Sequence, residues 1–121
     1  MNPRPRSITI IGWLFIAVGV LSLIGGLLPG RHKAGSEPPL AFGHLLAHFL
    51  HLLAIIGGVF LLRGCNWARW LLVAWMGVHI VIGARHGLGP TLLHIGIFGT
   101  IGYFLFLPNS SKYFRGRNGP A

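Results

Sequence analysis

Four long apolar runs dominate this sequence and restrict the folds open to it. The first two have about 22 residues each, enough to cross the roughly 30 Å hydrocarbon core of a bilayer as helices. The other two are near the lower limit of about 17 residues for a spanning helix. The four predicted spans are residues 7–28, 40–62, 67–84 and 91–107. The sequence therefore predicts an all-α membrane protein with four transmembrane helices in two helical hairpins.

The composition supports a lipid environment. Charged residues make up 9% of the chain, against roughly 25% in soluble proteins, so a soluble fold of this length would lack a charged surface. The loops between the runs are short, and residues 108–121 form a polar, basic tail. We therefore predict a single four-helix domain over residues 1–121, with any binding site within or beside the helices.

Lysine and arginine are divided unevenly between the two sides of the membrane that these spans define. One side holds Arg4, Arg6, Arg63, Arg69, Lys112, Arg115 and Arg117, and the other holds Arg31, Lys33 and Arg85. The positive-inside rule therefore predicts that both termini are cytoplasmic. A net charge of +9 on a soluble protein would suggest nucleic acid, but these cations flank apolar runs, so no nucleic-acid partner is predicted.

Three stretches at the edges of the spans carry a resemblance. They are "RPRSITIIGWLFIAVGV", "GVFLLRGCNWARWLL" and "YFLFLPNSSKYFRG". In these stretches the chain resembles small, uncharacterised bacterial four-helix inner-membrane proteins. The resemblance implies a multi-pass protein of the bacterial inner membrane, and its motifs mark membrane edges rather than chemistry.

Small residues predict the packing faces, because they let helices approach closely in a bilayer. Gly12, Gly19 and Gly26 repeat at seven-residue spacing on the first span. On the second span, small residues occupy one face, and a stripe of histidines lies beside it. The small residues of the third and fourth spans lie opposite His79 and His94. If small residues face inward there too, these histidines face outward with Trp75 and Phe98, toward lipid or another subunit.

The histidines are concentrated in the outer half of the membrane. At 1.5 Å per residue, His44, His48 and His51 lie about 6, 12 and 17 Å from the outer end of the second span. His79 and His94 lie about 8 and 5 Å below the outer ends of theirs. Ionisable groups at such depths are expensive and often functional, so all five are candidate cofactor ligands. His44 and His48 are also metal candidates, because i, i+4 spacing presents two imidazoles to one ion.

An all-imidazole environment suits haem iron, a chlorin magnesium, copper, or hydrogen bonds to a quinone. The spans contain no Asp or Glu, which catalytic zinc sites often include. The alternative is that the histidines bind nothing, and are amphipathic residues near the interface or interhelical hydrogen bonds. If they are functional, the deepest pair, His48 and His51, should matter most.

Three functions remain open at this point. The leading hypothesis is a structural or accessory subunit of a membrane complex, or a homo-oligomer, with the lipid bilayer and other membrane subunits or itself as partners. The second is binding of a histidine-ligated cofactor, and the third is an oligomeric transporter or channel gated by histidines, which titrate near pH 6.5. No enzyme activity is predicted, because the sequence has no nucleophile elbow, P-loop or HExxH motif.

Overall fold

The computed structural model of this chain describes residues 3–28 and 42–118. That part of the chain forms helices and no strand: α1 (Arg6–Leu27), α2 (Phe42–Leu62), α3 (Asn66–Ala84), α4 (Leu88–Leu105) and α5 (Pro108–Asn118). Helices α1 to α4 are each long and apolar enough to cross a membrane. The all-α class, with four helices able to span a membrane, is thereby confirmed; residues 40–41, at the start of the second predicted span, lie outside the described residues. The helical part of the tail, α5, was not anticipated from the sequence.

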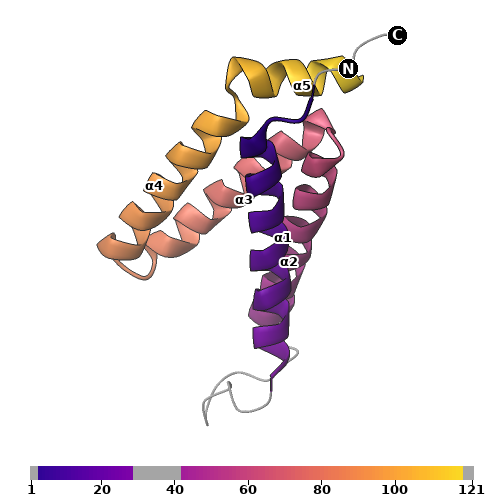
Figure 1. Cartoon of the computed structure of the whole chain (residues 1–121). Coiled ribbons are helices and arrows are strands. Elements are labelled where there is room, and N and C mark those ends of the chain that lie inside the picture. The colour runs from indigo at the N-terminus through magenta and orange to yellow at the C-terminus, as the bar shows by residue number, and fades with distance from the viewer. Residues whose placement is uncertain (1–2, 29–41, 119–121) are drawn as a thin grey trace, which may run out of the picture.

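Helices α1 and α2 form the first hairpin and have the most extensive contact of any pair (Figure 1). Glycines make this contact possible, because a Cβ atom at Gly58 would lie 2.7 Å from the carbonyl oxygen of Gly12. A Cβ atom at Gly19 would likewise lie 2.8 Å from the carbonyl oxygen of His51. The packing face predicted for the first span is therefore the one that α1 presents to α2.

Helices α3 and α4 form the second hairpin, which is inclined to the first in Figure 1. The turns before α3 and α4 contain Gly64 and Gly87, whose φ angles are 81° and 119°. Residues other than glycine rarely adopt such positive φ angles. Trp75 joins the two hairpins. Its indole Nε1 donates a hydrogen bond of 2.6 Å to the carbonyl oxygen of Leu50, and its ring meets Phe15 edge-to-face at 5.4 Å.

The small residues that lie opposite His79 and His94 do not face inward, so the packing face predicted for α3 and α4 is wrong, although Gly83 is buried and a Cβ atom there would lie 3.1 Å from Nδ1 of His94. A Cβ atom at Gly77, Gly96 or Gly99 would meet no described atom within 4 Å. Trp75 and Phe98, expected to face outward, instead pack against the buried core. The reason is the separation of the hairpins: α4 makes little contact with α1, and bulky side chains such as Trp75 and Phe98 occupy part of the wider gap between the hairpins.

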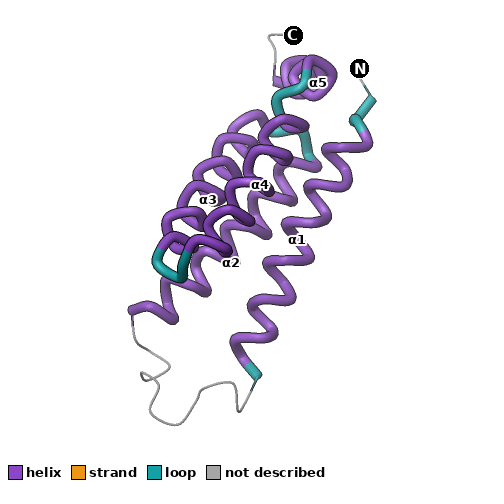
Figure 2. Tube along the Cα trace, turned by 90° about the vertical axis from the view of Figure 1, so that its left-hand side faces the viewer, coloured by secondary structure: helices purple, strands orange, loops and turns teal. Residues whose placement is uncertain are grey.

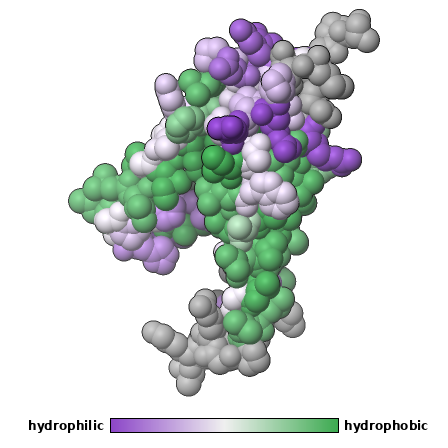
Figure 3. Space-filling model, in the orientation of Figure 1, coloured by the Kyte–Doolittle hydropathy of each residue, from purple (hydrophilic) through white to green (hydrophobic). Residues whose placement is uncertain are grey.

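Helix α5 crosses one end of the bundle. Figure 2 shows it nearly end-on, while the four long helices are seen along their length. The Tyr113 hydroxyl donates to the carbonyl oxygen of Leu62 at 3.2 Å, and the Ser110 hydroxyl donates to that of Phe104 at 2.8 Å. Both ends of the described chain lie here, and Figure 3 shows hydrophilic side chains gathered at this end.

Candidate functional site

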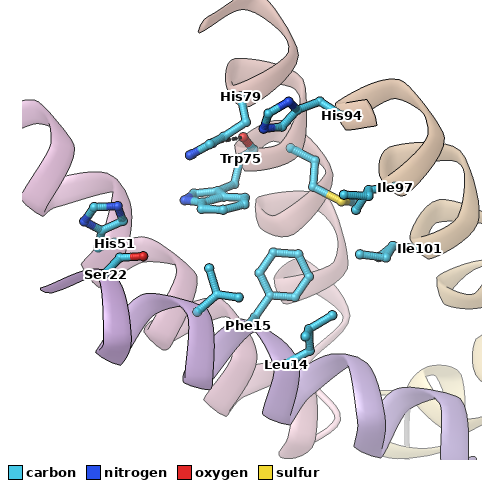
Figure 4. Close-up of a pocket in the computed structure, with 11 residues that line it drawn as sticks. Leu14, Phe15, Ser22, His51, Trp75, His79, His94, Ile97 and Ile101 are labelled. Atoms are coloured by element: carbon cyan, nitrogen blue, oxygen red, sulfur yellow. Dashed lines mark hydrogen bonds between the residues drawn. The ribbon is translucent and has the colours of Figure 1, made fainter. Parts of the chain in front are cut away.

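A pocket of about 380 Å³ lies between the two hairpins, and all four spans contribute to its wall. It is lined by Leu14, Phe15, Val18 and Ser22 of α1, His51 of α2, Trp75, Met76 and His79 of α3, and His94, Ile97 and Ile101 of α4. The wall is mainly apolar, and its polar side chains are three histidines, one serine and one tryptophan. Figure 4 shows His79 and His94 together at one side and His51 with Ser22 at another.

Trp75 positions His79. Residues four apart on a helix lie on the same face, so His79 lies directly above Trp75 on α3. The two rings stack with their centroids 3.7 Å apart and their planes 27° apart. Because the indole is itself fixed by Leu50 and Phe15, the imidazole of His79 rests on an anchored platform.

Backbone carbonyls determine which nitrogen of two of the histidines carries the proton. Nδ1 of His79 lies 3.0 Å from the carbonyl oxygen of Trp75, and Nδ1 of His94 lies 2.6 Å from that of Pro90. A carbonyl oxygen can only accept, so each Nδ1 donates, and in a neutral ring Nε2 keeps its lone pair. The ring centroids are 6.4 Å apart. Two imidazoles from neighbouring helices, each with an acceptor nitrogen, therefore line the same pocket.

His51 contributes a polar group from the first hairpin. Its Nδ1 is buried and has no hydrogen-bond partner among the described residues. Leaving such a group unsatisfied costs about 1–3 kcal/mol. Ser22 adds a hydroxyl, which both donates and accepts.

The structure brings three of the five histidine candidates to this pocket and leaves two outside its lining. His79 and His94 line it rather than facing lipid or a partner, which corrects the orientation expected for them. Of the deepest pair, His51 lines the pocket, whereas His48 packs on α1. A Cβ atom at Gly26 would lie 2.9 Å from Cε1 of His48. His44 lies in the first turn of α2, away from the pocket lining.

No metal centre is formed by the part of the chain that the structure describes. Within residues 3–28 and 42–118, no three His, Cys, Asp or Glu side chains lie close enough together to hold an ion. Binding of a metal by His44 and His48 stays a prediction, as does a haem, a chlorin or copper at the histidines.

Ser22 and Trp75 were not predicted as site residues. The signal for Trp75 was present, since its i, i+4 spacing to His79 places both on one helical face. No comparable signal distinguished Ser22, which lies one helical turn before Gly26 on the first span.

Comparisons with protein-family models, curated proteins and solved structures found no match to this chain. Its function is therefore argued from the chemistry of the pocket. The resemblance to small bacterial four-helix membrane proteins stays an expectation from the sequence.

Proposed function

We propose that this small integral membrane protein binds a lipophilic ring compound with hydroxyl groups, such as the reduced form of a quinone, between its four spans. One observation carries the proposal: His51, His79 and His94, from three different helices, converge on a cavity whose walls are otherwise mainly apolar. The volume of about 380 Å³ is within the range of ligand pockets, roughly 300–1,000 Å³.

The hydrogen-bonding pattern supports hydroxyl groups on the ligand. With Nδ1 committed to a backbone carbonyl, His79 and His94 each offer an acceptor at Nε2, and an acceptor requires a donor. The rings of Trp75 and Phe15 give the wall aromatic surface, which favours a ring by stacked or edge-to-face contact. A reduced quinone has both a ring and two hydroxyl donors.

Binding can be tested on protein reconstituted in liposomes. A short-chain hydroquinone is titrated while tryptophan fluorescence is recorded, because Trp75 lies in the pocket wall. We expect saturable binding, and His79→Ala should raise the dissociation constant about tenfold, through loss of one hydrogen bond and of the stacked ring. The control is His86→Ala, in the exposed turn between α3 and α4. The absence of saturable binding to the wild-type protein would overturn the proposal.

Self-association, or docking of another membrane subunit, is the second candidate function, and a different observation favours it. On α4, Gly96, Gly99 and Gly102 each leave room for a Cβ atom with no described atom within 4 Å. Small residues of this kind let a second helix approach closely in a bilayer. Blue-native electrophoresis in mild detergent tests the idea: we expect a complex larger than one chain, which Gly99→Leu should disrupt. A strictly monomeric wild-type particle at native expression would count against it.

Transport remains the third candidate. Four helices in one copy make a thin wall around any pore, so this function requires several copies. Flux through liposomes that does not change between about pH 7.5 and 5.5 would argue against a histidine gate.

A further inference from the structure

Arg69, in the first turn of α3, holds α5 against the end of the bundle. It is only 7% exposed, and its guanidinium lies 4.9 Å from the ring centroid of Phe106 and 4.7 Å from that of Phe114. Nη1 donates a hydrogen bond of 3.2 Å to the Ser111 hydroxyl, and Nη2 donates to the side-chain oxygen of Asn66. These partners are all neutral. Arg69 therefore positions α5 through neutral partners, which leave its positive charge in place.

Exposed cations surround Arg69, and we refer to this set as the basic end. It consists of Arg4 and Arg6 before and at the start of α1, Arg63 in the α2–α3 turn, and Lys112 and Arg115 on α5. Nη1 of Arg4 lies 3.1 Å from the carbonyl oxygen of Leu62, which also accepts from Tyr113 at 3.2 Å. These two bonds bring the three segments together.

The basic end has no acidic side chain to neutralise it within the described part of the chain. Glu37, the single acidic residue of the sequence, lies outside residues 3–28 and 42–118. The exposed Arg4, Arg6, Arg63 and Arg115 therefore form no ion pair with Asp or Glu of that part. Their charge is complementary to that of an anionic lipid headgroup.

Aromatic side chains place the basic end at the level of the lipid headgroups. Trp67 and Trp70 are 48% and 57% exposed, and they contact Phe60 at 5.0 Å and Phe106 at 5.1 Å between ring centroids. Exposed tryptophans near the end of a span mark the membrane–water interface. Since Phe106 also contacts Arg69, α5 and its cations lie at the same depth.

We propose that the basic end binds the phosphate groups of anionic phospholipids. Lysine and arginine near the membrane surface attract anionic lipid, and both side chains bind phosphate oxygens through charge-assisted hydrogen bonds. The cations come from three segments around the rim of the bundle rather than from one enclosed site. Such an arrangement suits several lipids in the bilayer plane, not one free phosphate ion. This inference is independent of the ligand in the pocket.

The test uses the full chain reconstituted with phosphatidylcholine and phosphatidylglycerol, one of the two lipids being brominated. Bromine quenches nearby tryptophan, so Trp67 and Trp70 report the lipid beside the basic end. We expect brominated phosphatidylglycerol to quench more than brominated phosphatidylcholine at equal mole fraction, corresponding to about fivefold enrichment. The enrichment should fall as salt is added, because exposed charges are screened.

The test variant is Arg63→Gln/Lys112→Gln/Arg115→Gln, and the control is Arg85→Gln, at the exposed turn on the opposite end. Enrichment lost in the first and kept in the second supports the proposal. Equal quenching by both lipids in the wild type, or enrichment unchanged in the triple variant, overturns it. So does loss of enrichment on adding inorganic phosphate at constant ionic strength, since the site would then take a free anion. Should the triple variant fail to reconstitute, Lys112→Gln/Arg115→Gln and the salt response of the wild type decide.

Discussion

Protonation of individual imidazoles should control binding in the pocket. His51, His79 and His94 are the titratable side chains of its lining, and the last two act as acceptors only while Nε2 is unprotonated. Once protonated, an imidazole donates at both nitrogens and no longer accepts. We therefore expect the dissociation constant of a short-chain hydroquinone to rise as the pH falls.

The same fluorescence titration, repeated at a series of decreasing pH values, measures this effect. A double variant, His79→Ala/His94→Ala, should bind weakly at every pH and show a smaller dependence on pH. The His86→Ala variant is the control and should behave like the wild type. A wild-type affinity that depends on pH no more than that of the double variant would contradict the assigned acceptor roles.

A glycine-to-alanine substitution should destabilise the protein at a glycine that packs against another helix, but not at a glycine that has no neighbour. In Gly58→Ala, the new Cβ atom would lie 2.7 Å from the backbone oxygen of Gly12 and 2.9 Å from Cγ1 of Ile16. Relieving such overpacking costs about 1–3 kcal/mol, which exceeds the gain of up to about 1 kcal/mol from replacing glycine in a helix. We expect lower stability, measured as the free energy of unfolding in mixed micelles at increasing mole fraction of SDS.

Gly77→Ala is the matched control for this experiment. It also lies in the middle of a span, but its Cβ atom would meet no described atom within 4 Å. The variant should be as stable as the wild type or slightly more stable. Equal destabilisation by both substitutions would show that the close contact of α1 with α2 does not cause the loss of stability in Gly58→Ala.

At the scale of elements, α5 should depend on one aromatic side chain. Phe114 is fully buried and packs against the guanidinium of Arg69. Phe114→Ala should cost about 3–5 kcal/mol of local stability and release α5 from the bundle, because a large buried ring is removed. Hydrogen exchange should then become faster in residues 108–118 and stay slow in α1 and α2.

Asn109→Ala, at an exposed position of the same helix, is the control and should leave hydrogen exchange of α5 slow. Protection of α5 that survives Phe114→Ala would mean that its hydrogen bonds alone hold it. The three side-chain bonds involved are those of Tyr113 to Leu62, Ser110 to Phe104 and Arg69 to Ser111.

Hydrophobicity was enough to predict the four spans, because a bilayer imposes their length and composition whatever they pack against. The spacing of the glycines on α1 was likewise enough to predict its packing face. The same argument failed for α3 and α4. Helical periodicity shows which residues share a face, but which face turns inward depends on the distance between the hairpins, and here the large side chain of Trp75 faces inward.

The candidate site could be predicted as a set of residues but not as a place. The free-energy cost of an ionisable side chain inside a bilayer singled out His51, His79 and His94. It singled out His44 and His48 equally, and these lie outside the pocket lining. Their convergence depends on how two hairpins meet, information that no single helix contains. Helix α5 was missed because Tyr113 and Phe114 are too few for a periodic signal, although Pro108 marks a favourable first helical position.

At the scale of the whole molecule, the ends of the bundle should face opposite sides of the membrane. The described chain begins and ends at the basic end, while the α3–α4 turn lies at the other end. In a Cys65→Ser background, Gly116→Cys should react with a membrane-impermeant maleimide only after the cells are opened. His86→Cys should react in intact cells. The physical reason is the excess of Lys and Arg at the basic end, which favours the cytoplasm.

The reverse labelling pattern would show that the protein has the opposite orientation, with the basic end outside and the histidine pocket nearer the cytoplasm. Both cysteines are at exposed positions, so access to the reagent depends on the membrane and not on burial. Detergent-solubilised protein, in which both should react, is the control.

The position of α5 in the chain has a consequence for how the protein is made. Its anchors are spread over α2, α3 and α4, through Leu62, Arg69 and Phe104. Because α5 follows all four spans, it is the last element to leave the ribosome, and its contacts form only once these spans are in place. We therefore expect the spans to enter the bilayer by their own hydrophobicity. A chain that ends before Pro108 should insert both hairpins but lack these contacts.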